Sequence, residues 1–90
     1  MNELDIVPML KKSKIYDAVI KILEIRLDRQ RKFGDSIFDS DEKYFQFFIT
    51  EKYNRAFNTT DIEAKKDSLL DLALYALIYY TSLMQRGDKK

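Results

Sequence analysis

Residues that interrupt helices are scarce in this chain, which has two glycines and one proline among 90 residues. They stand at Pro8, Gly34 and Gly87, so long stretches carry no breaker. Between the first two, apolar side chains recur at the spacing of an α-helix, as at Ile15 and Val19. Strand-like alternation, repeats and low-complexity segments are absent from the sequence. The predicted fold class is therefore all-α.

Three main helices joined by short loops are predicted, a pattern that favours an antiparallel three-helix bundle. They span residues 14–33, about 40–57, and about 61 to 85 or 86. We expect one small domain with a short extension at each end. Its parts are an N-terminal arm at residues 1–12, which is either a short helix or an extended lead, a helical domain at residues 13–87, and a polar tail at residues 88–90.

The ends of the predicted helices are marked by residues that satisfy unpaired backbone groups. Gly34 suits the end of the first helix, because glycine readily adopts the left-handed conformation common there. N-terminal caps are predicted at Ser13, Asp39 and Thr60. The last two precede a glutamate by three residues, which is the spacing of a capping box.

The apolar content is high for a chain of this size. Hydrophobic residues make up 46% of the sequence and aromatic residues 13%. Phe45, Phe48 and Ile49 on the second helix are predicted core residues, because they share one helical face. A single layer of three helices does not easily hide so much apolar surface. We therefore expect a homo-oligomer.

Several function classes are excluded by composition. The absence of cysteine and histidine excludes disulfides, thiolate catalysis, Ser-His-Asp triads and the common zinc sites. A metal would have to be held by carboxylates, carbonyls and water, which selects Mg²⁺, Mn²⁺ or Ca²⁺. The net charge of +1 gives no reason to expect binding to duplex nucleic acid or to a membrane. Without a recognisable signal peptide, a cytoplasmic protein is the default.

Asp71 is the residue that points most directly to function. It lies within the apolar run at residues 69–78, where a carboxylate is costly unless it gains a cation, a metal or good hydrogen bonds. Asp67 and Glu63 precede it at steps of four, so the three acids follow one helical stripe. The alternative is that Asp71 pairs with a core arginine or lysine while the other two acids are solvated.

A second set of charges lies on the helix at about 40–57 and in the loop before it. Glu51, Lys52 and Arg55 belong to that helix, and Asp35 belongs to the loop. If this helix packs antiparallel against the last one, acids from both meet in the groove between them. Carboxylates around Mg²⁺ would hold a di- or triphosphate, and the cations would bind the same phosphates. The alternative is ordinary surface pairing, since Glu51 and Arg55 are four residues apart.

Three segments, in this order, resemble a known family. Residues 33–36 read Phe-Gly-Asp-Ser, residues 51–55 read Glu-Lys-Tyr-Asn-Arg, and residues 67–76 read Asp-Ser-Leu-Leu-Asp-Leu-Ala-Leu-Tyr-Ala. Over roughly residues 14–86 the chain resembles the phage and bacterial "nucleotide modification associated" family. That family is similar to the MazG-like all-α nucleotide pyrophosphohydrolases.

The resemblance implies roles for particular residues. Lys52 and Arg55 would face phosphate, and Asp67 and Asp71 would be metal ligands. Gly34, Asp35 and Tyr75 would belong to the ligand site. MazG-like enzymes form dimers or tetramers, hold Mg²⁺ with carboxylates from two helices, and hydrolyse a nucleoside triphosphate to a monophosphate and pyrophosphate.

This chain departs from the pattern of those enzymes in three places. Only Glu51 stands where they carry a Glu-Glu-x-x-Glu set. The acids Asp67 and Asp71 are four apart instead of three, and Leu74 replaces an asparagine.

Three functions follow as expectations. The first is binding of a nucleotide or related phosphorylated ligand in an inter-helix groove. In its catalytic form, a Mg²⁺-dependent pyrophosphohydrolase, Glu51, Asp67 and Asp71 would hold the metal, while Lys52 and Arg55 would stabilise developing charge. The second is a non-catalytic, phage-type protein that sequesters a nucleotide signal of host defence, acting in the host cytoplasm. The third is a protein-interaction module that uses the aromatic second helix and the arm.

Overall fold

The computed structural model describes residues 3–88, and every regular element among them is helical. Its elements are α1 (Glu3–Leu10), α2 (Lys14–Phe33), the 3₁₀ turn η1 (Ser36–Asp39), α3 (Glu42–Asn58) and α4 (Ile62–Asp88). The predicted all-α class is confirmed, and the three main helices begin and end close to their predicted bounds. The arm is a fourth helix, so the described chain is not simply a three-helix bundle.

The two ends of the chain differ in part from their predicted form. Residues 1–2 of the arm and 89–90 of the tail lie outside the described residues. α4 continues through Gly87 to Asp88, beyond its predicted end. Within residues 3–88 no helix has both the length and the apolar character that a membrane span requires.

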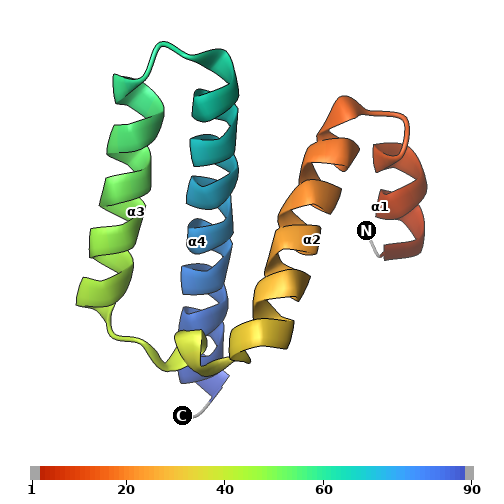
Figure 1. Ribbon diagram of the computed structural model, residues 1–90. Helices are drawn as coiled ribbons and strands as arrows, with labels where there is room; N and C mark the ends of the chain where they lie inside the picture. Colours follow the sequence, from red (N-terminus) through yellow and green to blue (C-terminus); the bar gives the residue numbers. More distant parts are fainter. Residues whose placement is uncertain (1–2, 89–90) are drawn as a thin grey trace.

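Figure 1 shows α3 and α4 side by side and antiparallel, with α2 on the other side of α4. α4 makes its most extensive contact with α3 and smaller contacts with α2 and η1. α1 lies beyond α2, away from α4, after the short connection at residues 11–13 (Figure 1). α4 is therefore the central helix, and α2 is held more loosely than α3.

The residues that cap α2 are those predicted from the sequence, whereas the residues that cap the starts of α3 and α4 are not. Ser13 Oγ accepts from the Ile15 N–H at 3.3 Å, and the Gly34 N–H donates to the Gln30 carbonyl at 2.8 Å. The predicted cap Asp39 is wrong, because η1 occupies residues 36–39 and α3 begins later. Asp41 caps α3 instead, its Oδ1 accepting from the Tyr44 N–H at 2.9 Å.

The predicted cap of α4, Thr60, is also displaced by one residue. Asp61 Oδ1 accepts from the Glu63 N–H at 3.1 Å, and Thr59 Oγ1 accepts from the Asp61 N–H at 3.2 Å. The two side chains on either side of Thr60 therefore bond the backbone where the chain turns into α4.

The core lies mainly between α3 and α4. Phe45, Leu74 and Ile78 form a buried cluster. The Phe45 ring stacks on Tyr79 with ring centres 4.9 Å apart. Of the predicted core residues, Phe45 is fully buried, and Phe48 and Ile49 are half-buried.

The turn η1 is tied to α4 by two polar contacts. Ser82 Oγ donates to the Phe38 carbonyl at 2.6 Å, and the Arg86 guanidinium donates to the Ser40 carbonyl. Ser82 is fully buried, so this hydrogen bond satisfies a polar group that would otherwise be costly. These contacts fold the segment after α2 back onto α4, where it forms one wall of a pocket.

Candidate functional site

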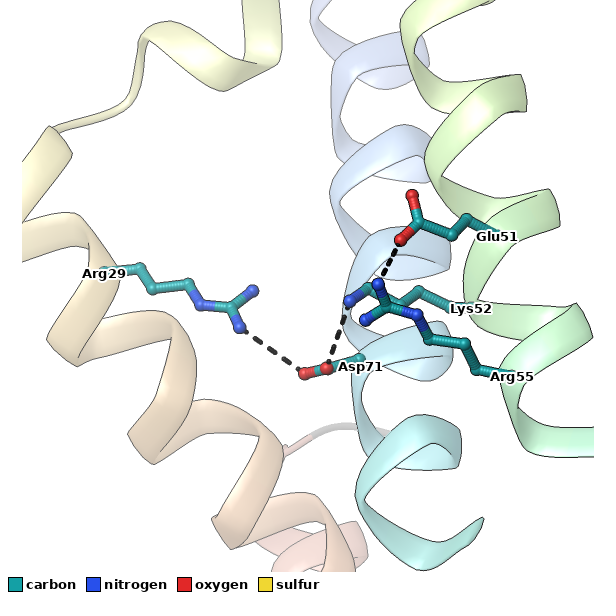
Figure 2. Close-up of polar contacts among 5 residues, drawn as sticks. All are labelled: Arg29, Glu51, Lys52, Arg55 and Asp71. Atoms are coloured by element: carbon teal, nitrogen blue, oxygen red, sulfur yellow. Dashed lines mark hydrogen bonds and ion pairs between the residues drawn. The ribbon is translucent and has the colours of Figure 1, made fainter. Parts of the chain in front are cut away.

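Asp71 bridges two cations from two other helices. Its Oδ1 lies 3.4 Å from Arg29 Nη2 on α2, and its Oδ2 lies 3.5 Å from Lys52 Nζ on α3. Figure 2 shows the carboxylate on α4 between these two side chains. The side chain of Asp71 is 27% exposed, so it is half-buried rather than enclosed. The alternative in which Asp71 pairs with an arginine or lysine is therefore what the structure shows.

Asp71, Arg29 and Lys52 form a trio of charges that is loosely joined and carries a net charge of +1. Both distances exceed the roughly 2.8 Å of a strong charge-assisted hydrogen bond. The side chain of Lys52 is only 15% exposed, so most of its length is covered, and its ammonium lies beside Asp71. One carboxylate shared by two cations leaves a local excess of positive charge.

The other acids of the predicted site do not gather around Asp71. Glu51 Oε1 pairs with Arg55 Nη2 on its own helix at 2.6 Å, also drawn in Figure 2. Asp67 is exposed. Within residues 3–88 no group of three acidic side chains is placed to hold a metal ion.

A pocket of about 400 Å³ lies next to this trio, between α2, η1 and α4, and α3 contributes Tyr44 to its wall. This volume falls within the range typical of small-molecule sites. Arg29 belongs to both the pocket and the trio. The wall combines cationic, aromatic, hydroxyl and apolar side chains with one glycine: Arg26, Arg29, Phe33, Gly34, Ser36, Ile37, Ser40, Tyr44, Tyr75 and Ile78.

Arg26 is the better fixed of the two pocket arginines. Its Nη2 lies 2.5 Å from Asp35 Oδ1, and its guanidinium carbon lies 4.9 Å from the centre of the Phe38 ring. The other oxygen of Asp35 accepts from Gln30 Nε2 at 3.4 Å. Asp35 is more exposed than Arg26, so it orients the guanidinium from the solvent side.

The two pocket tyrosines belong to a continuous group of aromatic rings. Phe48 stacks on Tyr75 with centres 5.5 Å apart and an interplanar angle of 10°, and Tyr44 contacts Phe48 at 4.7 Å. Burial raises the pKa of Tyr75, Tyr44 and the nearby acids raise it further, and Arg29 lowers it. The Tyr75 hydroxyl therefore stays protonated at neutral pH and is able to donate a hydrogen bond.

The predicted ligand-binding residues divide into two groups. Gly34 and Tyr75 line the pocket, and Asp35 supports it through Arg26. Lys52 does not line the pocket, and it contacts Asp71, which in turn contacts the pocket residue Arg29. Arg55 is exposed and is paired with Glu51.

Arg26, Arg29 and Tyr44 line the pocket but were not among the site residues predicted from the sequence. A signal for the two arginines exists, because positions 22, 25, 26 and 29 follow the i, i+3, i+4, i+7 pattern of one helical face. Isoleucines fill the first two of these positions and arginines the last two. Cations at core-facing positions are costly without an anionic partner.

Comparison of the chain with protein-family models, curated proteins and solved structures found no match. The geometry of the pocket and of the trio beside it is therefore the basis for assigning a function.

Proposed function

We propose that the pocket between α2, η1 and α4 binds a nucleotide or a related phosphorylated ligand without needing a metal ion. The observation that carries the proposal is the presence of two arginines and two tyrosines in one pocket of about 400 Å³. Guanidinium groups bind phosphate through two parallel hydrogen bonds. Aromatic rings stack on bases, with about 1–3 kcal/mol for each stacked base.

The charge pattern favours binding without metal. Each oxygen of Asp71 faces a cation, so Mg²⁺ would have to displace Arg29 and Lys52 to reach it. The same cations supply positive charge that a phosphorylated ligand needs. This supports the second expectation, a non-catalytic phage-type protein that sequesters a nucleotide signal, and we propose that it acts as a homo-oligomer, a dimer or a tetramer.

The binding proposal is tested by thermal unfolding in EDTA with ATP, cyclic di-AMP and inorganic pyrophosphate as probes. At about 100 times Kd, a bound probe should raise Tm by roughly 10 °C or more. Arg29→Ala should abolish the shift. Arg31→Ala, which changes an exposed arginine of the same helix outside the pocket wall, should keep it. No shift with any probe, or an equal shift in the Arg29→Ala variant, would contradict the proposal.

A second candidate is the Mg²⁺-dependent pyrophosphohydrolase. It is favoured by one observation: Asp71 of α4 lies 3.5 Å from Lys52 Nζ on α3, and Glu51 directly precedes Lys52, so carboxylates of two helices belong to one region. In this version Glu51 and Asp67 would have to move toward Asp71 for the three carboxylates to hold the metal, and Lys52 and Arg55 would stabilise the developing charge.

The hydrolase is tested by incubation with Mg²⁺ and a panel of nucleoside triphosphates. Release of pyrophosphate above the level of an Asp71→Ala control would support it. Equal release from both proteins would exclude it, while binding in EDTA would still stand.

A third candidate, a protein-interaction module, is favoured by the exposed rings on α3. Phe47, Tyr53 and Phe57 are all more than half exposed. Light scattering bears on this candidate, because a monomer without any nucleotide response would support it against the other two.

A further inference from the structure

Helix α2 has 20 residues, and none of its side chains is buried. Ile22 and Ile25 pack partly against the core beside α4. In proteins most of the stability of a helix comes from the tertiary packing of its apolar face. The described part of the chain therefore leaves α2 incompletely covered.

A second apolar stripe on α2 is open to solvent. Ile15, Val19, Leu23 and Leu27 follow one another at steps of four and are between 39% and 58% exposed. They remain exposed with α1 in place, so the arm of the same chain does not cover them. A surface helix needs one apolar stripe toward its own core, and α2 has a second one.

The stripe borders an apolar groove between α2 and α4. This groove has a volume of about 260 Å³ and reaches the buried core residues Leu74 and Ile78. Leu23 on α2 and Leu77 on α4 form exposed parts of its wall. A side chain entering here would extend the core of the domain.

The exposed area of the whole chain is too large for a monomer of its mass. Its accessible surface is 7235 Å², whereas a folded monomer of 10.7 kDa is expected to expose about 5,500 Å². The radius of gyration is 14.8 Å, compared with about 12 Å for a typical domain of this length. The excess of roughly 1,700 Å² is about twice what one partner buries in a standard interface.

We infer that a second copy of this chain packs against the α2 stripe and the adjoining groove, forming a two-fold dimer. Two reasons favour a second copy as the occupant. The excess exposed area of each chain has the size that an obligate homodimer interface buries. The i, i+4 row of uncharged side chains on α2 can also pack against the same row of another copy across a two-fold axis. In an antiparallel pair of α2 helices, Ile15 of one copy lies opposite Leu27 of the other, and Val19 lies opposite Leu23. This interface specifies the assembly proposed above and does not depend on which ligand binds.

The interface would also support the ligand pocket. α2 carries Arg26 and Arg29, so a partner that holds α2 against α4 fixes both guanidinium groups. Only this consequence rests on the proposed binding function, and ligand binding and dimerisation would then strengthen each other.

The interface is tested by sedimentation velocity on the full chain at micromolar concentration. The wild-type chain should sediment as a dimer, and Leu23→Glu as a monomer. Phe57→Glu places the same charge on an exposed apolar residue of α3 and should leave the dimer intact. A wild-type monomer, or a Leu23→Glu dimer, would overturn the proposal without affecting the nucleotide-binding test.

A disulfide experiment covers the case in which Leu23→Glu fails to fold. The chain contains no cysteine, so engineered thiols report only on their own positions. Oxidation of a mixture of Val19→Cys and Leu23→Cys chains should give a mixed disulfide dimer, and Phe57→Cys should give none. Absence of the mixed disulfide, or equal crosslinking through Phe57→Cys, would contradict the interface.

Discussion

At the scale of single residues, Asp71 is a carboxylate in an apolar helix that is held between two cations. Its apolar sequence context predicts that it has a partner, and the structure supplies Arg29 and Lys52. The identity of these partners was not predictable, because each belongs to a different helix and meets Asp71 only after three helices pack. The acidic stripe in the sequence suggested a metal, whereas the structure surrounds Asp71 with cations.

We predict that Asp71→Asn strengthens anion binding in the absence of metal. The variant removes the negative charge that Arg29 and Lys52 share, so that Arg29 on the pocket wall loses its anionic partner. Because a partly exposed pair contributes about 0.2–1 kcal/mol, affinity for ATP should rise by up to about fivefold. Calorimetric titration in EDTA measures this change, with Asp67→Asn as the exposed control on the same helix. Loss of binding would show that the carboxylate itself takes part in holding the ligand.

Gly34 ends α2 in a conformation that other residues avoid. Its φ is 71° and its ψ is −154°, a region occupied almost only by glycine. Gly34→Ala should lower the free energy of unfolding by about 1–3 kcal/mol. The matched variant Gly87→Ala lies within α4 and should be neutral or stabilising. Neither added methyl group meets an atom within 4 Å, so chemical denaturation compares the backbone conformations alone.

The raised pKa of Tyr75 makes stability depend on alkaline pH. Unfolded tyrosine loses its proton near pH 10, while folded Tyr75 keeps it to higher pH. The folded state then binds more protons than the unfolded state, so its contribution is complete below pH 10 and is lost as pH rises through the folded pKa. Denaturation series across this range should show a smaller decline for Tyr75→Phe than for the wild type. An equal decline of stability in both proteins would mean that groups other than Tyr75 cause the pH dependence.

At the scale of elements, the sequence predicts most of what is local. The positions of α2, α3 and α4 follow from periodicity and from Gly34, because helix formation depends on neighbours a few residues apart. The caps of α3 and α4 were misplaced because Asp39, Asp41, Thr60 and Asp61 offer competing choices within a few residues. The 3₁₀ turn decides the first case, and its hydrogen bonds to α4 are non-local.

The observed cap of α3 leads to a direct comparison of two aspartates. Asp41→Ala removes the side chain that accepts from the Tyr44 N–H and should destabilise the chain by about 1 kcal/mol. Asp39→Ala, at the cap position expected from the sequence, should have a smaller effect. Thermal unfolding of both variants tests the assignment. A larger loss of stability in Asp39→Ala than in Asp41→Ala would support the capping box predicted at residues 39–42 instead.

At the scale of the whole molecule, the pocket was only partly predictable. Gly34 and Tyr75 were expected at a ligand site through the family resemblance, and both line the pocket. Arg26 and Tyr44 meet there because η1 folds back onto α4 through Ser82, and no local pattern in the sequence encodes that approach. The apolar excess in the composition corresponds in the structure to the uncovered face of α2, which we propose is covered by a second copy of the chain.

The most direct test of the central claim is to map ligand binding residue by residue. Amide chemical shifts of the ¹⁵N-labelled full chain would be followed by NMR during titration with ATP and with cyclic di-AMP in EDTA. A metal-free nucleotide site predicts that shifts with at least one of them are largest at Gly34, Ser36, Ser40, Tyr44 and Tyr75. Unchanged spectra with both nucleotides, or changes confined to the outer face of α3, would contradict it.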